Sequence, residues 1–567
     1  MLRIRRSVTV SARKWFLTGV VAATVVLIVG VCGKADAFVI PTGSDDVHIR
    51  WDNTFRYTLS QRVQSQNNDI LGDPNIDDGD RNFDEGIVSN RLDLLSEADV
   101  VFKDTFGMRA SGAFWYDAAY EDIDNNSAFS SNHIGRDGQP SAGLSDYTDR
   151  VNRGPSGELL DAFAFGKFNI ADMPLNLKAG RHTIYWGESM LGNGGAHGIS
   201  YGQAPLDIGK ALATPGIELK ELFRPLNQIS MQFQPLQELS IAAQYYLQWE
   251  AHRFPGPGSY FDFANVLGEG ESLIAGFNPA TGQLVRYLNT GDVEPDQARD
   301  WGVSARWSPN WIGDGTFGFY YRNFSDKSAQ IHISPVTGTY NWAYPDDIDL
   351  FGISFAKQIF GFSVGSEVSY RQNMPLASTA AIIGPFPGAT AASLPGDGDT
   401  FGARGDTWHG LINLLYLFNK MPIFDSASLL AEFTWCHWQR VSQHEELFKG
   451  RSGYTARDRV DKDYVGGSLN FTPTWFQVLT GVDLSMPLSV FTGLIGNAAT
   501  NGGGCKNSGS YGAGFSADIN QRHKVELKYS GFFGDYDVTP TGLVTTAADS
   551  AALKDRGMIT LTVKTSF

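Results

Sequence analysis

Charged residues of both signs gather in three segments near the start of the chain, where they alternate with other residues. Side chains of this kind on one surface have two possible roles. They can pair with one another and hold that surface rigid, or they can attract and guide a solute along it. The sequence leaves both interpretations open. The charged residues concerned are Arg50, Asp52 and Arg56, then Arg91, Asp93 and Glu97, then Arg109 and Asp117, and Trp115 is expected on the same face.

A glycine-rich segment, 187–215, is the second candidate for chemistry. Its glycines permit a sharp return of the chain, and Pro205 can open a short helix. The segment is too apolar for a loop that water surrounds on every side, so we expect it to fold inward as a constriction. The predicted constriction residues are Gly194, Gly195, Tyr201, Gln203 and Lys210. Arg181, His182, Trp186 and Glu188 precede them and are expected to line its entrance.

Catalytic and metal-binding patterns are weak. The histidines in strand-like segments lack a Gly-x-Ser-x-Gly motif and a metal-binding His pair. The acidic stretch 73–85 partly matches a calcium loop, but its glycine falls one residue late. A solvated loop, or one bridged to lipopolysaccharide by divalent ions, fits that stretch better. We therefore expect no enzyme, no cofactor and no metal, and we expect Cys436 and Cys505 to be unpaired thiols rather than a disulfide.

The elements that must position these residues have a period of two. From Val47 to Ser60 apolar residues alternate with polar ones, which is the pattern of a strand with one apolar and one polar face. The same alternation recurs to the C-terminus, where Ile559, Leu561, Val563 and Phe567 share one face. A final strand that ends in an aromatic residue resembles the signal by which barrel-assembly machinery recognises its clients.

Short and long connections between the strands alternate strictly, as in transmembrane barrels. Nine loops and eight turns predict 18 strands, with 16 as the alternative because 159–170 and 175–186 alternate poorly. Brief turns are expected near 102–105, 170–174, 234–238, 308–315, 358–361, 419–426, 472–474 and 520–523. Long polar loops are expected near 61–86, 121–157, 187–224, 251–298, 325–348, 373–405, 441–462, 487–509 and 533–556.

The N-terminal 37 residues have the basic region, apolar run and small-residue cleavage site of a secretory signal peptide. The predicted mature chain, 38–567, has 39 basic and 60 acidic residues, a formal charge of −21. This acidity argues against a nucleic-acid partner. The chain has no long apolar run after residue 31, which argues against a polytopic helical membrane protein.

Together these patterns predict an all-β fold, a transmembrane antiparallel barrel of about 18 strands in the outer membrane of a Gram-negative bacterium. We expect short periplasmic turns, long extracellular loops and one loop folded into the lumen. A lumen of this width is too large for wall side chains to fill. Aromatic residues are expected in the membrane-interface girdles, among them Trp51, Trp301, Trp307, Trp408 and Trp475.

Several stretches resemble a proteobacterial outer-membrane family known only as a domain of unknown function. They are Asp77–Phe83, Ser89–Glu97, Gly180–Ser189, Tyr201–Pro205 and Arg404–Trp408. The resemblance implies an outer-membrane barrel, often encoded near inner-membrane efflux-type transporters and near genes for degrading steroids or aromatic compounds. It implies no site residues.

The expected function is a channel or transporter for small, hydrophobic or aromatic organic compounds. One alternative is a structural component of a trans-envelope export system, which would dock through its periplasmic turns. An outer-membrane hydrolase is a weaker alternative. The expected partners are outer-membrane lipid and lipopolysaccharide, the barrel-assembly machinery, a small-molecule solute and an inner-membrane efflux-type transporter.

Overall fold

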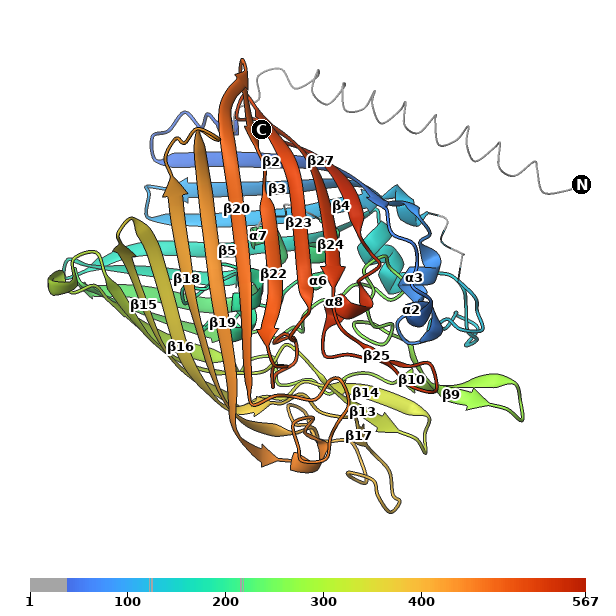
Figure 1. Ribbon diagram of the computed structural model, residues 1–567. Coiled ribbons are helices and arrows are strands. Elements are labelled where there is room, and N and C mark those ends of the chain that lie inside the picture. Colours follow the sequence, from blue (N-terminus) through green and yellow to red (C-terminus); the bar gives the residue numbers. More distant parts are fainter. Residues whose placement is uncertain (1–37, 122, 124–125, 215–216, 218) are drawn as a thin grey trace, which may run out of the picture.

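The computed structural model describes residues 38–567, except 122, 124–125, 215–216 and 218 (Figure 1). The predicted signal peptide lies outside the described residues. In the described part of the chain, one 20-stranded sheet forms the body of the molecule. The short β1 (Phe38–Ile40) only extends one edge of this sheet, and β21 (Val482–Ser485) continues into β22 (Leu488–Ile495). The wall is therefore a closed antiparallel barrel of 18 strands, and the alternative of 16 is wrong.

The other wall strands follow in chain order. They are β2 (Val47–Arg62), β3 (Gly86–Phe102), β4 (Phe106–Asp117), β5 (Ser156–Ile170), β6 (Met173–His182), β7 (Leu226–Leu236), β8 (Leu239–Tyr246), β11 (Trp301–Trp307), β12 (Thr316–Phe324), β15 (Ile348–Ile359), β16 (Phe362–Pro375), β18 (Arg404–Phe418), β19 (Ser426–Gln443), β20 (Asp463–Leu479), β23 (Gly509–Ile519), β24 (His523–Phe533) and β27 (Met558–Ser566).

The first and last wall strands close the barrel. β2 pairs with β27 from Thr54 opposite Ser566 to Arg62 opposite Met558. Phe567 and Asn53 then exchange two backbone hydrogen bonds of 2.8 and 2.9 Å. Closure pairs the backbone groups that a free sheet edge would leave exposed, which is the condition for a sheet in lipid.

One predicted turn is wrong. The Thr-Pro-Thr sequence near 472–474 suggested a turn, but β20 continues to Leu479 and the hairpin turns at 480–481. Pro473 is tolerated inside the strand because it lies opposite the break between β21 and β22, where the ladder pairing is interrupted. The following loop accordingly begins after Ile495, not at 487.

The barrel has two unlike ends. Short hairpin turns join the strands at one end, which we call the turn end, and long connections join them at the other, the loop end (Figure 1). The connections contain β9 (Ser272–Asn278), β10 (Gln283–Asn289), β13 (Gln330–Ser334), β14 (Thr339–Ala343), β17 (Ala381–Ile382), β25 (Asp537–Val538) and β26 (Val544–Thr545). They also contain α2 (Asn68–Gly72), α3 (Asp78–Asn82), α4 (Asp146–Thr148), α5 (Gly192–His197), α6 (Ile208–Ala213), α7 (Leu219–Leu222), α8 (Asp549–Ala552) and the single turns 118–120, 149–153 and 445–447. A further single turn, 310–312, lies in the hairpin at the turn end.

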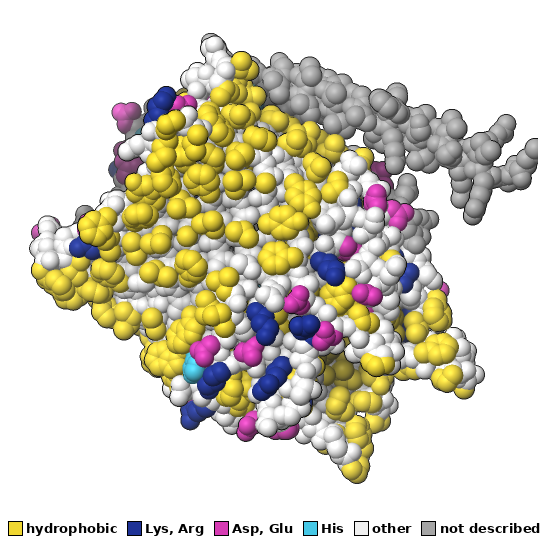
Figure 2. Space-filling view, in the orientation of Figure 1, with side chains coloured by type: hydrophobic (Ala, Val, Ile, Leu, Met, Phe, Trp, Pro, Cys, Tyr) yellow, Lys and Arg dark blue, Asp and Glu magenta, His cyan; other side chains and the backbone are white. Residues whose placement is uncertain are grey.

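Polar side chains point inward and apolar side chains point outward. On β2 the inward Arg56, Thr58 and Arg62 are at most 2% exposed, whereas outward side chains such as Phe114 and Ile353 are about half exposed, at 52% and 55%. Figure 2 shows the resulting hydrophobic surface over the strands, with charged side chains mainly toward the loop end. The outward face is therefore the one suited to acyl chains.

The predicted girdle tryptophans lie on this outer surface. Trp301 and Trp307 begin and end β11 and are 40% and 38% exposed. None of the helices in the described part of the chain has the length and apolar character needed to cross a membrane.

The acidic stretch 73–85 is packed into the loop end, so the expectation of a solvated loop is wrong. Asp80 is fully buried between two guanidinium groups, 2.7 Å from Arg62 and 3.1 Å from Arg556. Asp78 accepts a hydrogen bond of 2.9 Å from the backbone of Asn132. The carboxylates are buried because arginines and amides from distant segments pair with them, which a local sequence pattern does not reveal.

The ion cluster around Asp80 gives a stability prediction. Asp80→Asn leaves the buried Arg62 and Arg556 short of one carboxylate, and breaking a buried pair costs about 3 kcal/mol or more. We expect the variant to unfold at lower urea concentration in detergent, as followed by the loss of the folded band on unheated gels. Asp84→Asn, at an exposed position of the same stretch, is the control and should unfold with the unaltered protein. Equal midpoints for Asp80→Asn and the control would contradict the role of the cluster.

Candidate functional site

The segment 183–225, of which all but 215–216 and 218 are described, turns back into the lumen, as predicted for 187–215. We call its described residues the plug. Two carboxylates of the wall hold its first half. Glu367 on β16 accepts backbone hydrogen bonds from Ser189 at 3.0 Å and Ile199 at 2.6 Å. Glu432 on β19 accepts from Met190 at 2.8 Å and from Leu191 at 3.2 Å. Wall carboxylates thus take the backbone donors that this glycine-rich stretch cannot pair within itself.

Two buried arginines bind the carbonyl groups of the same stretch. Arg322 on β12 donates to Ile199 at 3.0 Å and to Tyr201 at 2.6 Å. Arg371 on β16 donates to Ala196 at 3.1 Å and to Gly198 at 2.9 Å. The plug is therefore bound to the wall through its backbone. Its side chains are not needed for this attachment, so small residues are sufficient at these positions.

Gly187 shows how closely the plug approaches the wall. Its φ of +98° lies in the region that favours glycine, and a Cβ added there would lie 2.3 Å from a carboxylate oxygen of Glu367. A larger residue at this position would displace the carboxylate that holds the plug.

The predicted constriction residues take part in this anchoring. The Tyr201 hydroxyl donates to Asp326 at 2.6 Å, and Arg371 lies 4.4 Å above its ring. Gln203 accepts from the Trp186 backbone at 2.8 Å and donates to Gln244 of β8 at 2.9 Å. These contacts make Tyr201 and Gln203 structural supports of the plug. Gly194 and Gly195 lie in α5.

The charged residues of the first strands form ion pairs with each other and with the plug. Arg56 makes a bidentate contact of 3.0 and 2.9 Å with Glu221 of α7 and lies 3.6 Å from Asp93. Arg91 pairs with Asp93 at 2.9 Å. The first interpretation of these charges, that they pair and hold the lumen rigid, therefore describes Arg56, Arg91 and Asp93.

A second part of this network lies nearer the turn end. Arg109 contacts Glu97 and lies 3.1 Å from Asp99 and 3.2 Å from Asp161. Lys220 of α7 also contacts Glu97. This second group of pairs therefore ties α7 to the wall as well.

Trp115 lies between two cations. Arg91 is 5.5 Å and Lys210 is 5.4 Å from its ring, and Lys210 also pairs with Glu158 of β5 at 3.3 Å. The structure thus brings together three residues that the sequence placed in two separate groups. The contact ties α6 to the wall.

Other predicted lumen residues lie apart from this network. Arg50 pairs with Asp52 at 2.6 Å but its side chain is 62% exposed toward the turn end. Asp117 caps local backbone groups and accepts from Ser89 at 2.7 Å. In the part of the chain that the structure describes, the hydrogen bonds and ion pairs of Arg50 and Asp117 do not involve the plug.

The four residues expected at the entrance face different neighbours. Arg181 pairs with Glu250 at 3.4 Å, the two ring nitrogens of His182 contact Gly180 and Ser230, Trp186 packs near Tyr320, and Glu188 accepts from Ser354 at 3.1 Å. They do not form one cluster. Each secures the plug or the wall at a separate point.

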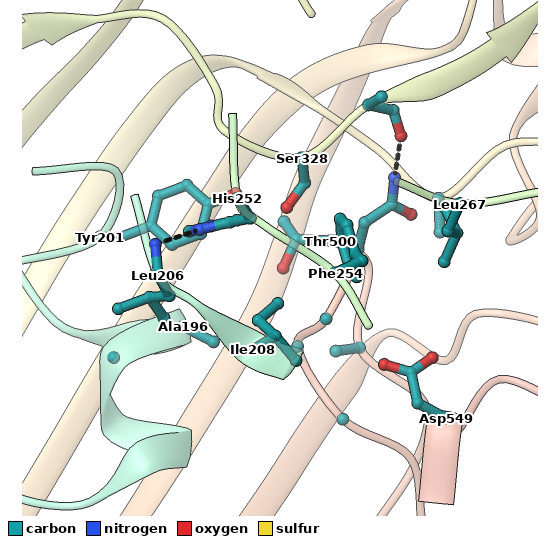
Figure 3. A pocket seen from close by; sticks show the side chains of 18 of the residues that line it. Ala196, Tyr201, Leu206, Ile208, His252, Phe254, Leu267, Ser328, Thr500 and Asp549 are labelled. Atoms are coloured by element: carbon teal, nitrogen blue, oxygen red, sulfur yellow. Dashed lines mark hydrogen bonds between the residues drawn. The ribbon is translucent and has the colours of Figure 1, made fainter. Parts of the chain in front are cut away.

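A cavity of about 950 Å³, the upper cavity, lies between the plug and the loop-end segments. Its lining is mainly apolar and aromatic, and Figure 3 shows a few polar groups, such as Ser328, Thr500 and Asp549, among Phe254, Leu267 and Ile208. A cavity of this size and lining suits an organic molecule with an aromatic or aliphatic body.

His252 and Asp549 are two of the titratable groups of the upper cavity whose pKa values are shifted. Burial, with Lys327 and Arg224 nearby, lowers the pKa of His252 to about 3, so its neutral Nδ1 can accept the Leu206 N–H at 2.9 Å (Figure 3). Asp549 is exposed toward the cavity, and the reduced hydration of that cavity raises the pKa of its carboxyl to about 6.

A smaller cavity of about 340 Å³, the lower cavity, lies on the turn-end side of the plug. Arg109, Asp161, Lys178 and His182 contribute charged and polar groups to its wall. Lys220 and Phe223 line both cavities. The short stretch around α7 is therefore the partition between two compartments of one lumen.

Sequence reasoning missed this partition. It ended the constriction at Pro215, whereas the residues shared by both cavities follow at Lys220 and Phe223. In the run Leu219–Arg224 the apolar residues recur three and four positions apart, with charged residues between them, and that amphipathic helical pattern was the available signal. The aromatic lining from Phe254 to Leu267 was missed because it belongs to a loop that had been assigned to solvent.

Similar barrels are found among solved structures. Acinetobacter baumannii OccAB2 has a TM-score of 0.40 and 8% identity, with 92% of this chain and 98% of that chain covered. Pseudomonas aeruginosa OpdK with vanillate has a TM-score of 0.39 and 9% identity at the same coverage. A BenF-like porin from Pseudomonas fluorescens Pf-5 has a TM-score of 0.39 and 8% identity, again at that coverage.

No curated protein matches the chain significantly. The family model described as "Protein of unknown function (DUF1302)" matches residues 18–567, nearly the whole chain. The resemblance found in the sequence is thereby confirmed. The chain belongs to the DUF1302 family.

Proposed function

We propose that the protein is an outer-membrane channel for small, hydrophobic or aromatic organic compounds. The observation that carries this proposal is the pair of cavities within one closed barrel, which share Lys220 and Phe223 as their partition. A solute would leave water in the apolar upper cavity, pass the partition and reach the polar lower cavity. The turn end then faces the periplasm and the loop end faces outward.

The upper cavity supports the choice of solute class. Phe254, Phe263, Leu267 and Ile208 offer apolar surface, and the hydroxyls of Ser328 and Thr500 offer neutral polar contacts. A smaller number of charged side chains, among them Lys449 and Asp549, also line the cavity. Aromatic walls favour flat, apolar solutes through both area burial and ring stacking. A hydrated ion gains little binding free energy in such a compartment, because apolar walls do not replace its contacts with water.

The partition is the element that must move or stretch for transport. α7 is held on one side by the bidentate Arg56–Glu221 contact and by the contact between Lys220 and Glu97. The Arg56–Glu221 pair is buried and costly to break, whereas the Lys220 side chain is 41% exposed, so its contact with Glu97 exchanges more readily with water. The Lys220 side of α7 is therefore the part that suits a gate.

The proposed partners follow from this placement. Outer-membrane lipid covers the apolar belt, lipopolysaccharide surrounds the loop end, and β27 with Phe567 is the segment offered to the barrel-assembly machinery. An inner-membrane efflux-type transporter and a structural role in export remain predictions. The short turns between β5 and β6 or β15 and β16 offer little docking surface for them.

The partition gives a conductance prediction. Phe223→Ala removes a ring that lines both compartments, so the single-channel conductance in planar bilayers should rise at least about twofold. Phe319→Ala removes an equally large ring from the outward face of β12, where Phe319 is 43% exposed, and should leave the conductance unchanged. An unaltered conductance in Phe223→Ala would remove α7 from the solute path.

The upper cavity gives a binding prediction. Ile208→Lys places a charge among the aromatic residues of the cavity, so a neutral fluorescent naphthylamine should bind at least about tenfold more weakly. Fluorescence titration of the detergent-solubilised protein measures this. Val336→Lys, at a loop position that is 65% exposed, is the matched control and should bind like the unaltered protein. Equal affinity in Ile208→Lys would exclude this cavity as the binding compartment.

Asp549 gives a pH prediction. Its pKa is raised to about 6, so the side chain is neutral below that pH and negatively charged above it. An aromatic sulfonate, which stays anionic throughout, should therefore bind more tightly at pH 5 than at pH 8. In Asp549→Asn the affinities at the two pH values should become equal, as measured by the same titration. A pH dependence that persists in Asp549→Asn would assign it to another group.

A further inference from the structure

Three metal-binding side chains meet where α5 of the plug touches the barrel wall. They are His197 of α5, His409 of β18 and Cys436 of β19. The Nδ1 atoms of the two histidines lie 3.0 Å apart, and one ring nitrogen of each histidine and the Cys436 sulfur all lie within 4.8 Å of one another. All three side chains are at most 1% exposed. The solute path described above uses none of them.

The hydrogen bonds around His197 leave its Nδ1 as a free lone pair. Its Nε2 lies 2.7 Å from the Gly503 carbonyl oxygen, which can only accept, so Nε2 carries the proton. His409 Nε2 lies 2.9 Å from the Thr407 hydroxyl, which can accept or donate a hydrogen bond, so either ring nitrogen of His409 can carry the proton. With both protons on Nε2, the two Nδ1 lone pairs face each other across 3.0 Å, an arrangement that a cation between them would stabilise. With the His409 proton on Nδ1, the two rings form an N–H···N hydrogen bond instead. Histidines that bind metals commonly donate their other N–H to a carbonyl, as His197 does.

Two groups beside the Cys436 sulfur favour a thiolate, against the burial of the thiol, which disfavours it. The backbone N–H of Ala499 donates a hydrogen bond to the Cys436 sulfur, and Arg371 lies close enough to act on that sulfur electrostatically. The Tyr464 ring lies 5.4 Å from the His197 ring and closes one side of the cluster. Two imidazoles and one thiolate in a buried trigonal set are the donors typical of copper sites.

The distances require only a small adjustment. Metal–nitrogen and metal–sulfur bonds of about 2.0 to 2.3 Å would hold the two nitrogens about 3.3 to 3.6 Å apart. The rings therefore need to separate by a few tenths of an ångström from their present 3.0 Å. α5 joins the wall through hydrogen bonds to Arg371, which can follow a shift of this size.

Charge decides between the candidate ions. Arg371 already places one positive charge beside both histidines and the cysteine. A divalent ion with one thiolate would add a second net positive charge, whereas a cuprous ion with one thiolate is neutral. Soft ligands such as thiolate also favour Cu(I).

We propose that His197, His409 and Cys436 bind one Cu(I) ion that fastens the plug to the barrel wall. The ion would enter through the upper cavity, because the neighbouring Gly503 and Gly504 line that cavity. The bound ion would join α5, β18 and β19 at one point, and through Gly503 also the loop 496–508. This site goes beyond the proposed channel function and does not depend on it.

The test is an anaerobic Cu(I) titration of the full-length folded protein in detergent, in competition with a colorimetric cuprous chelator. We expect the unaltered protein to withdraw one equivalent of Cu(I). Cys436→Ser and His409→Gln should each weaken binding at least about tenfold. Cys505→Ser is the matched control, because Cys505 is a buried, unpaired thiol hydrogen-bonded to Asn497 at 2.8 Å and is not part of the cluster.

A second measurement keeps the test valid if a variant folds poorly. Cu(I) should raise the unfolding temperature of the unaltered protein and of Cys505→Ser but not that of Cys436→Ser, and X-ray absorption should show one sulfur and two nitrogen neighbours. The proposal is overturned if the unaltered protein binds Cu(I) no better than Cys436→Ser, if Cys505→Ser loses binding equally, or if Zn(II) binds and Cu(I) does not. If the unaltered protein binds Cu(I) no better than Cys436→Ser, the contact between the two histidines is only a hydrogen bond. The conductance of Phe223→Ala is unaffected by any of these results.

Discussion

Charged side chains of the barrel wall carry the backbone of the plug, and the architecture of the lumen depends on this interaction. Glu367 and Glu432 accept its N–H groups, and Arg322 and Arg371 bind its carbonyl groups. Each such charge-assisted hydrogen bond is worth about 1.5 to 3 kcal/mol. Together these hydrogen bonds stabilise the plug in place of an apolar core, which a glycine-rich segment cannot form. Removing one partner would leave a buried charge unpaired, which explains why the plug is held so firmly at its first half.

The second half of the plug is attached differently. α6 and α7 are held by ion pairs with side chains, such as Arg56 with Glu221 and Lys210 with Glu158. Ion pairs between two flexible side chains can adjust their geometry more than hydrogen bonds to the backbone can, so the lumen combines a fixed segment with a more yielding one. The partition between the two cavities belongs to the yielding half, and the histidine–cysteine cluster belongs to the fixed half. The proposed gate therefore lies in the half of the plug that is attached through side-chain ion pairs.

The fold was predictable from alternation alone to a large extent. Val47–Ser60 and Ile559–Phe567 follow period two because one face meets apolar surroundings and the other a polar lumen, so strand number and inward residues followed from the pattern. The turn predicted near 472–474 is absent because the strand continues past Pro473, opposite the break between β21 and β22. The acidic stretch around Asp80 misled the prediction because its counter-charges, Arg62 and Arg556, lie far away in the chain.

By itself the sequence determined the barrel, its inward charges and the segment that enters the lumen, because period two and glycine content are local properties. Only the tertiary structure decided which charges meet, where the lumen divides and which histidines face a cysteine. His197, His409 and Cys436 lie in three separate elements, and their spacing in the sequence does not indicate that they lie close together. Lys220 and Phe223 likewise become a partition only because the wall positions α7 between two cavities. Closing a barrel brings together residues that are distant in the chain, and the geometry of that closure cannot be deduced from any one segment.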